Sequence, residues 1–183
     1  MAISVLNAFA DTGALVETSP GSFTVSAGTD RLLAYNLHMT GSTDTISVVT
    51  YGGQPMTEQE SAVSGGGFPA RVRIFTLDEA GIAAATGTGF GITGDVNGTF
   101  RATAVALEGV DQTTPVVDSG SGIASGGDIA DVVLTTVADG YAFAAAMVDH
   151  DTDVDQITWG SDLTERVEVR TSPTGNTLGA ADT

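Results

Sequence analysis

The chain has 183 residues, a formal net charge of −17 and no cysteine. Its length fits one β-rich domain, and its charge disfavours direct binding to nucleic acid or to an anionic membrane. The lack of cysteine excludes disulfides, thiolate metal sites and a cysteine nucleophile.

Every basic residue is an arginine, and acidic residues outnumber basic ones by 23 to 6. Partners are therefore expected to be basic, neutral or bridged by ions. The alternative is that the acidic surface only keeps the protein solvated in salty water, where screening weakens its self-repulsion. Residues 1–15 are apolar but lack a basic stretch and meet Asp11 early, so no signal peptide is expected. No apolar run is long enough to span a bilayer.

The first predicted strands lie at residues 23–25 and 31–39. The second is a nearly continuous apolar run, which predicts a central strand. β-branched residues at 46–51 lead into Gly52-Gly53 and a return at 54–59, which is typical of a hairpin, because glycine accepts positive φ most easily. The glycine-rich stretch at 64–69 reads as a loop and not as a phosphate loop, since no lysine follows it.

Further along, Asn97-Gly98 predicts a chain reversal. The residues at 113–128 are mostly Gly, Ser, Thr and Pro, which indicates a long crossing loop. The other predicted elements are a single helical turn at 78–85 and strands at 71–77, 87–93, 100–107, 129–135, 141–148, 157–159 and 163–170.

These elements predict an all-β antiparallel sandwich in a single domain over residues 1–183. An N-terminal segment, 1–20, is expected to be peripheral, and an irregular C-terminal tail, 171–183, is expected because no apolar strand follows Arg170. Either a C-terminal segment is missing or a neighbouring subunit covers an unpaired edge. Both alternatives favour assembly.

The candidate metal site is an acidic run in which Asp151, Asp153 and Asp155 are followed by Asp162, eleven residues after the first. This order is similar to that of a calcium loop, whose hard oxygen ligands suit calcium. However, Gln156 stands where the turn glycine is expected, and an aspartate replaces the final glutamate. A solvated loop at one end of the sandwich is the alternative.

Other candidate site residues are few. Trp159 and Tyr51 are candidates for a sugar-stacking platform, with packing in the core as the alternative. His38 lies in the predicted central strand and His150 in the acidic run, and neither stands beside a nucleophile motif. His38 is expected to be a packed or interface residue, and no catalytic residue is assigned.

Two phrases of the sequence carry a resemblance. Residues 50–57 (TYGGQPMT) and 109–115 (GVDQTTP) resemble the turns of a jelly-roll-type β-sandwich module found in bacteriophage virion proteins and in secreted bacterial proteins. The resemblance covers about residues 30–170. It implies a jelly-roll fold and no catalytic residues.

Two functions follow as expectations. The first is a non-enzymatic structural protein of a tailed-phage virion, most simply a capsid decoration or cement protein on the head. It would bind the major capsid protein or other virion proteins as a homo-oligomer, such as a trimer. The second is a tail or head fibre, or a receptor-binding or carbohydrate-binding module, with calcium as its only candidate ion.

Overall fold

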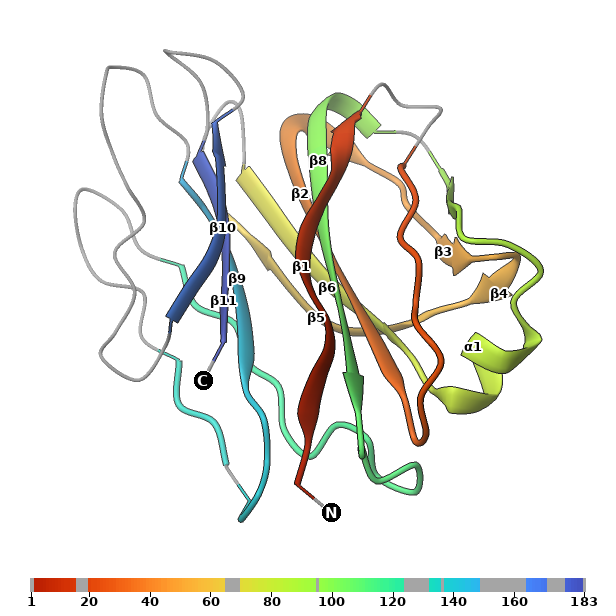
Figure 1. Cartoon of the computed structure of the whole chain (residues 1–183). Coiled ribbons are helices and arrows are strands. Elements are labelled where there is room, and N and C mark those ends of the chain that lie inside the picture. The colour runs from red at the N-terminus through yellow and green to blue at the C-terminus, as the bar shows by residue number, and fades with distance from the viewer. Residues whose placement is uncertain are drawn as a thin grey trace.

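The structure is a computed structural model that describes residues 2–15, 20–64, 70–94, 96–123, 132–135, 137–148, 164–170 and 177–182. These residues form strands and one short helix (Figure 1). In chain order the elements are β1 (Ser4–Leu15), β2 (Leu32–Asp44), β3 (Val48–Tyr51), β4 (Gln54–Pro55), β5 (Thr57–Val63), β6 (Ala70–Leu77), α1 (Glu79–Ala84), β7 (Phe90–Thr93), β8 (Val96–Glu108), β9 (Phe143–Val148), β10 (Thr164–Arg170) and β11 (Thr177–Asp182).

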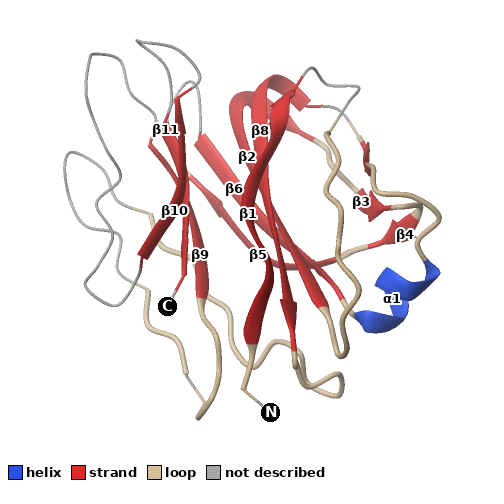
Figure 2. Ribbon diagram, viewed as in Figure 1, coloured by secondary structure: helices blue, strands red, loops and turns tan. Residues whose placement is uncertain are grey.

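Three antiparallel sheets form three layers (Figure 2). The central sheet has the strand order β1-β8-β2-β6-β5. The small sheet, β4-β3-β7, covers one of its faces together with α1, and the C-terminal sheet, β10-β11-β9, covers the other. The prediction of an all-β antiparallel sandwich is therefore confirmed. Jelly-roll connectivity stays a prediction.

Strand β2 lies in the middle of the central sheet and is buried on both faces, as its sequence predicted. Alternate side chains of a strand point to opposite faces, so a strand covered on both sides needs apolar residues at nearly every position. Toward the small sheet β2 presents Leu33, Tyr35, Leu37 and Met39, all at most 1 % exposed. Toward the C-terminal sheet it presents Leu32, Ala34, Asn36 and His38.

The larger hydrophobic core lies between the central and small sheets. Its aromatic centre is Phe90 on β7, whose ring stacks on Tyr35 with centroids 4.0 Å apart and contacts Tyr51 at 5.2 Å. Alanines at 102, 104 and 106 of β8 leave room for these large rings on the facing surface of the sheet. Many of the large side chains of this core come from β2, β3 and β7, so a small number of aromatic residues fills the space between the two sheets.

The predicted hairpin at Gly52-Gly53 is confirmed, with both glycines at positive φ (53° and 85°). The predicted helical turn is α1, which begins after Asp78; the Asp78 carboxylate accepts a hydrogen bond from the Gly81 N–H at 2.8 Å. Aspartate at this position satisfies one of the free N–H groups at a helix start. The helix has six residues, and no helix in the described part of the chain is long and apolar enough to cross a membrane.

Several predicted elements differ from the structure. Asn97-Gly98 was predicted to reverse the chain but lies within β8, where Asn97 pairs with Thr43 of the long strand β2. Pairing with an adjacent strand outweighs the local turn preference, and a register shift between Thr40 and Thr43 accommodates it. The turn instead uses Gly94, at φ 128°, where an added Cβ would lie 2.4 Å from the Thr45 carbonyl oxygen.

The predicted strand at 23–25 is an irregular segment joined by an isolated bridge between Ser22 and Gly89. Residues 132–135, predicted as part of a strand, form none. The predicted strand at 157–159 lies outside the described residues.

Both chain ends take part in sheets. The N-terminal segment, expected to be peripheral, contains β1, which pairs with β8 at the edge of the central sheet. The tail expected to be irregular contains β11, which lies between β9 and β10 and pairs with both. That expectation was wrong for 177–182, because the strand is set by pairing with Phe143–Val148 and not by an apolar pattern of its own.

Candidate functional site

Residues 50–57 and 109–115, which carry the resemblance, each place a glutamine side chain at one end of α1. The Gln112 side-chain oxygen accepts a hydrogen bond from the backbone N–H of Glu79, the first residue of the helix, at 2.9 Å. At the other end, the Gln54 side-chain amide donates to the carbonyl of Ala84, the last residue, at 3.2 Å. Each glutamine thus satisfies a helix-terminal backbone group that has no partner inside the helix.

The turn containing Gln112 is also tied to the start of β2. Its side-chain amide donates to the carbonyls of Arg31 at 3.2 Å and Val110 at 3.0 Å. The Val110 N–H donates to the Asp30 carbonyl at 2.9 Å. One glutamine therefore joins β2, α1 and the turn after β8, and all its polar atoms are used for this.

Arg31 and Glu79 complete the junction with a bidentate ion pair. The Glu79 carboxylate accepts from the Arg31 guanidinium, at 2.8 Å from Nε, and from the Arg31 backbone N–H at 2.9 Å. Hydrogen bonding to Arg31 lowers the pKa of Glu79 below its ordinary value, despite partial desolvation. The same pair raises the pKa of Arg31. The two charged groups thus join the start of β2 to the start of α1.

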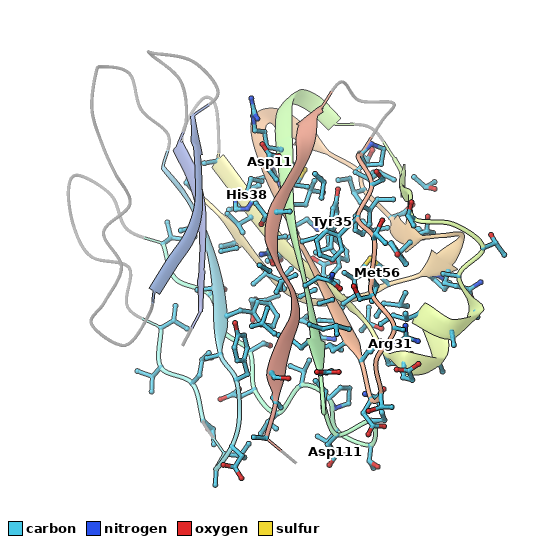
Figure 3. The ribbon with its side chains drawn as sticks, viewed as in Figure 1. Asp11, Arg31, Tyr35, His38, Met56 and Asp111 are labelled. Carbon is cyan, nitrogen blue, oxygen red and sulfur yellow. The ribbon has the colours of Figure 1, made fainter. Side chains whose placement is uncertain are left out.

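A row of polar side chains lies buried on the face of the central sheet that points to the C-terminal sheet. Asn36, His38 and Thr103 are each 0 % exposed. The Asn36 amide donates to the Thr103 hydroxyl at 3.2 Å, whereas Asn36 Oδ1 and both ring nitrogens of His38 have no hydrogen-bond partner. In Figure 3, His38 and Tyr35 point to opposite sides of the central sheet.

Burial lowers the pKa of His38 to about 4, and the backbone of Ala146 on β9 offsets this only in part. Ala146 does not reach hydrogen-bonding geometry with the ring. His38 is therefore neutral near pH 7. It has no access to solvent, so it matches the expected packed residue and is not placed for proton transfer to a bound substrate.

A groove of about 970 Å³, partly open to solvent, lies on the same face of the central sheet. Its floor is apolar, with Leu32 from β2, Ile74 from β6 and Leu107 from β8, and Phe143 at the start of β9 lines it as well. The opposite wall comes from the segment after β8, residues 109–112, 114–120, 134–135 and 137–142. The groove thus lies between the edge of the C-terminal sheet and a long connection.

Three hydrogen bonds fix the outer wall of this groove. The Ser119 hydroxyl donates to the Gln59 carbonyl on the edge strand β5 at 3.0 Å. The Thr135 N–H donates to the Asp118 carboxylate at 2.7 Å. The Asp118 carboxylate also accepts from the Ser119 N–H at 2.9 Å. The connection is therefore held at a set distance from the sheet and keeps the groove open.

The outer wall carries apolar side chains that face solvent. Five of the eight large apolar residues exposed in the described part of the chain fall between positions 117 and 137, so this exposure is concentrated in one segment. We call these five residues the apolar rim: Val117, Ile123, Val132, Val133 and Val137. Val133 is 94 % exposed. Large apolar side chains exposed within one segment make it a candidate surface for binding another molecule.

Among the side chains that the structure describes, the charged groups lining the groove are all acidic. No arginine lines it among the described residues. Arg31, Arg73 and Arg101 are each paired with a carboxylate elsewhere, those of Glu79, Glu58 and Asp11. The acidic residues that line the groove are Asp30, Glu60, Asp111, Asp118 and Asp139.

The predicted site residues have separate outcomes. Tyr51 is 3 % exposed, and its hydroxyl donates to the Phe23 carbonyl at 2.9 Å, so it belongs to the core and is not an exposed sugar platform. Trp159 and His150 lie outside the described residues. So do the four calcium candidates, Asp151, Asp153, Asp155 and Asp162, and calcium there stays a prediction. Within the described residues, no group of three or more His, Cys, Asp or Glu side chains is arranged to hold a metal ion.

The sequence analysis predicts neither the groove nor the apolar rim. One signal for them was present, because valine and isoleucine recur at 116, 117, 123, 129, 132, 133 and 137 within a stretch otherwise rich in Gly, Ser, Thr and Asp. Large apolar residues in a solvent-exposed connection have no core to fill, so they point to a binding surface.

No family model, curated protein or solved structure matches this chain. The resemblance to phage jelly-roll modules therefore rests on the two sequence phrases alone.

Proposed function

We propose that the chain is a non-enzymatic structural protein of a tailed-phage virion, and specifically a decoration protein that binds the outer surface of the head. Its partner would be the major capsid protein or another virion protein, and it would act as a homo-oligomer such as a trimer. The observation that carries this proposal is the exposed apolar rim beside an apolar groove. The ion pairs in the described part of the chain, such as Arg31–Glu79, join elements of the fold to one another.

Two further observations support a binding role over a chemical one. The motif residues Gln54 and Gln112 are engaged in holding α1, and His38 is buried away from solvent. Within the described part of the chain, the apolar rim and the groove beside it are then the surface we propose for contact with another molecule. A decoration protein works by burying such surface across subunit boundaries.

The test is the amount and location of the protein in purified particles. Heads and tails of the phage that encodes this chain are separated, and the protein is quantified by mass spectrometry against the major capsid protein. We expect many copies per head and none on tails. A few copies confined to tails would support the fibre or receptor-binding alternative instead, and absence from both fractions would refute a virion role.

A further inference from the structure

The groove and the apolar rim together have the chemistry of a docking site for a polypeptide segment. The groove volume of about 970 Å³ is at the upper end of the range for small-molecule sites, about 300–1,000 Å³. Apolar side chains are also exposed beside the groove. A Cβ added at Gly120, which lines the groove, would lie 2.9 Å from Val132 Cγ1, and Val133 follows in the chain; the two valines are 44 % and 94 % exposed. A small molecule held in the groove would leave these side chains in water, whereas a polypeptide would cover both.

The acidic side chains that line the groove favour a basic polypeptide over an acidic one. Two copies of this chain would bring the groove carboxylates of Asp30, Glu60 and Asp139 toward another acidic surface, within proteins of net charge −17. Like charges brought together at an interface cost free energy and slow association. A segment that carries arginine or lysine next to apolar side chains could pair with the groove carboxylates and also cover the apolar floor.

The site is also already shaped for binding. Ser119 and Thr135 hold the outer wall through their hydrogen bonds to Gln59 and Asp118. The backbone N–H groups of Thr135 and Ser119 also donate to the Asp118 carboxylate and lower its pKa, so its charge persists to more acidic pH than that of an ordinary aspartate. A partner would therefore lose little free energy in ordering this wall.

We propose that the groove and the apolar rim bind a basic, apolar segment of a partner protein. The proposal rests on the proposed function, in which that partner is a protein of the phage head. It adds the surface that makes the contact and the chemistry of the segment that the contact requires.

The experiment uses full-length protein and empty heads purified from a phage in which the gene for this chain is deleted. Binding is measured by co-sedimentation over a range of protein concentrations. The double variant Val132→Asp/Val133→Asp removes the apolar contact at exposed positions, and we expect its affinity to fall at least about tenfold. The matched control is Val48→Asp, at a valine 40 % exposed in the small sheet on the opposite side of the central sheet. Its affinity should stay within about twofold of the wild type.

A second pair of variants tests the charge. Asp139 has φ 59°, a conformation that asparagine also accepts, so Asp139→Asn removes a groove charge without straining the backbone. We expect weaker binding and a smaller loss of affinity when sodium chloride is raised, since fewer charges are screened. The control is Asp78→Asn, outside the groove, because asparagine also caps a helix. Circular dichroism and the unfolding midpoint confirm that each variant is folded.

Each outcome decides between the two proposals. Binding by the wild type but not by Val132→Asp/Val133→Asp supports both. Equal binding by the wild type and this variant overturns the docking site and leaves the virion role standing. No binding by the wild type overturns both. A wild type that self-associates in sedimentation, with a double variant that does not, identifies a second copy as the occupant and overturns the proposed basic partner.

Discussion

Gln112 and Glu79 are joined by a hydrogen bond of 2.9 Å, from the backbone N–H at the start of α1 to the side-chain oxygen of a residue in the turn after β8. The two residues are 33 positions apart in the chain. The contact closes a junction of three elements, because the Gln112 amide also donates to the Arg31 carbonyl. These hydrogen bonds give Gln112 a structural role, whereas the sequence of its turn predicted only a reversal of the chain.

Replacing Gln112 by leucine should destabilise the fold. The change leaves the Glu79 N–H and the Arg31 and Val110 carbonyls without their partner, and unmade hydrogen bonds at part-buried groups cost about 1–3 kcal/mol. The free energy of unfolding from urea titration measures the loss. Gln54→Leu is the comparison, since Gln54 makes one exposed hydrogen bond, to Ala84, and should cost less. Equal costs would show that the junction around Gln112 is not special.

Gly52 and Gly87 provide a matched pair of glycine-to-alanine substitutions. Gly52 has φ 53°, and an added Cβ would lie 2.6 Å from the Gly87 carbonyl oxygen, whereas a Cβ at Gly87 meets nothing within 4 Å. Gly52→Ala should therefore cost about 1–3 kcal/mol through backbone strain alone. Gly87→Ala should change the free energy of unfolding by less than about 0.5 kcal/mol. A small effect at Gly52 would mean that the hairpin adapts to the side chain.

The Arg31–Glu79 pair should make stability depend on pH in the acid range. Glu79 has a pKa below its ordinary value of 4.5, so the native state binds this proton less tightly than the unfolded state does. The stabilisation is fully present above pH 4.5 and is lost as the pH falls through the native pKa. The Arg31 and Glu79 side chains remain 15 % and 29 % exposed, so solvent and salt still screen the pair. Glu79→Gln should therefore cost no more than about 1 kcal/mol at pH 7, and less in high salt.

Unfolding of the wild type and Glu79→Gln is measured between pH 7 and pH 3. The difference in free energy between the two proteins should shrink as the pH falls. A constant difference across the range would show that the charge of Glu79 contributes nothing.

His38 should give a second, separate pH dependence. Its native pKa of about 4 lies below the ordinary value of 6.5, so between these values the unfolded state binds more protons than the native state. Stability should therefore decline as the pH falls from 6.5 to 4 and change no further through this group below that. Each unit of difference in pKa corresponds to about 1.4 kcal/mol.

The test for His38 is the slope of the unfolding free energy against pH. In His38→Leu this slope should be reduced between pH 6.5 and 4. The variant His150→Leu measures how much of the wild-type slope comes from the other histidine. Leucine at position 38 also removes two buried nitrogens that have no partner, so the variant need not be less stable at pH 7. An unchanged slope in His38→Leu would contradict the assignment.

Local features of the fold were predicted well from the sequence. The hairpin at Gly52-Gly53 and the start of α1 at Asp78 depend on backbone conformation and capping within a few residues, which sequence patterns report directly. The prediction failed at Asn97-Gly98 and at Thr177–Asp182, where pairing with a distant strand decided the conformation. For Tyr51 the sequence left core packing and a sugar platform open, because its burial depends on contacts with Phe90 and Phe23, which are distant in the chain.

The sequence alone determined the all-β class, the central place of β2 and the acidic character of the protein. These follow from composition and from patterns within single strands. The tertiary structure decided which faces are covered, where β11 pairs, and that Leu32, Leu107 and Val117 line one groove. Those features arise from contacts between residues far apart in the chain, and their free energy depends on packing and burial that no local pattern records.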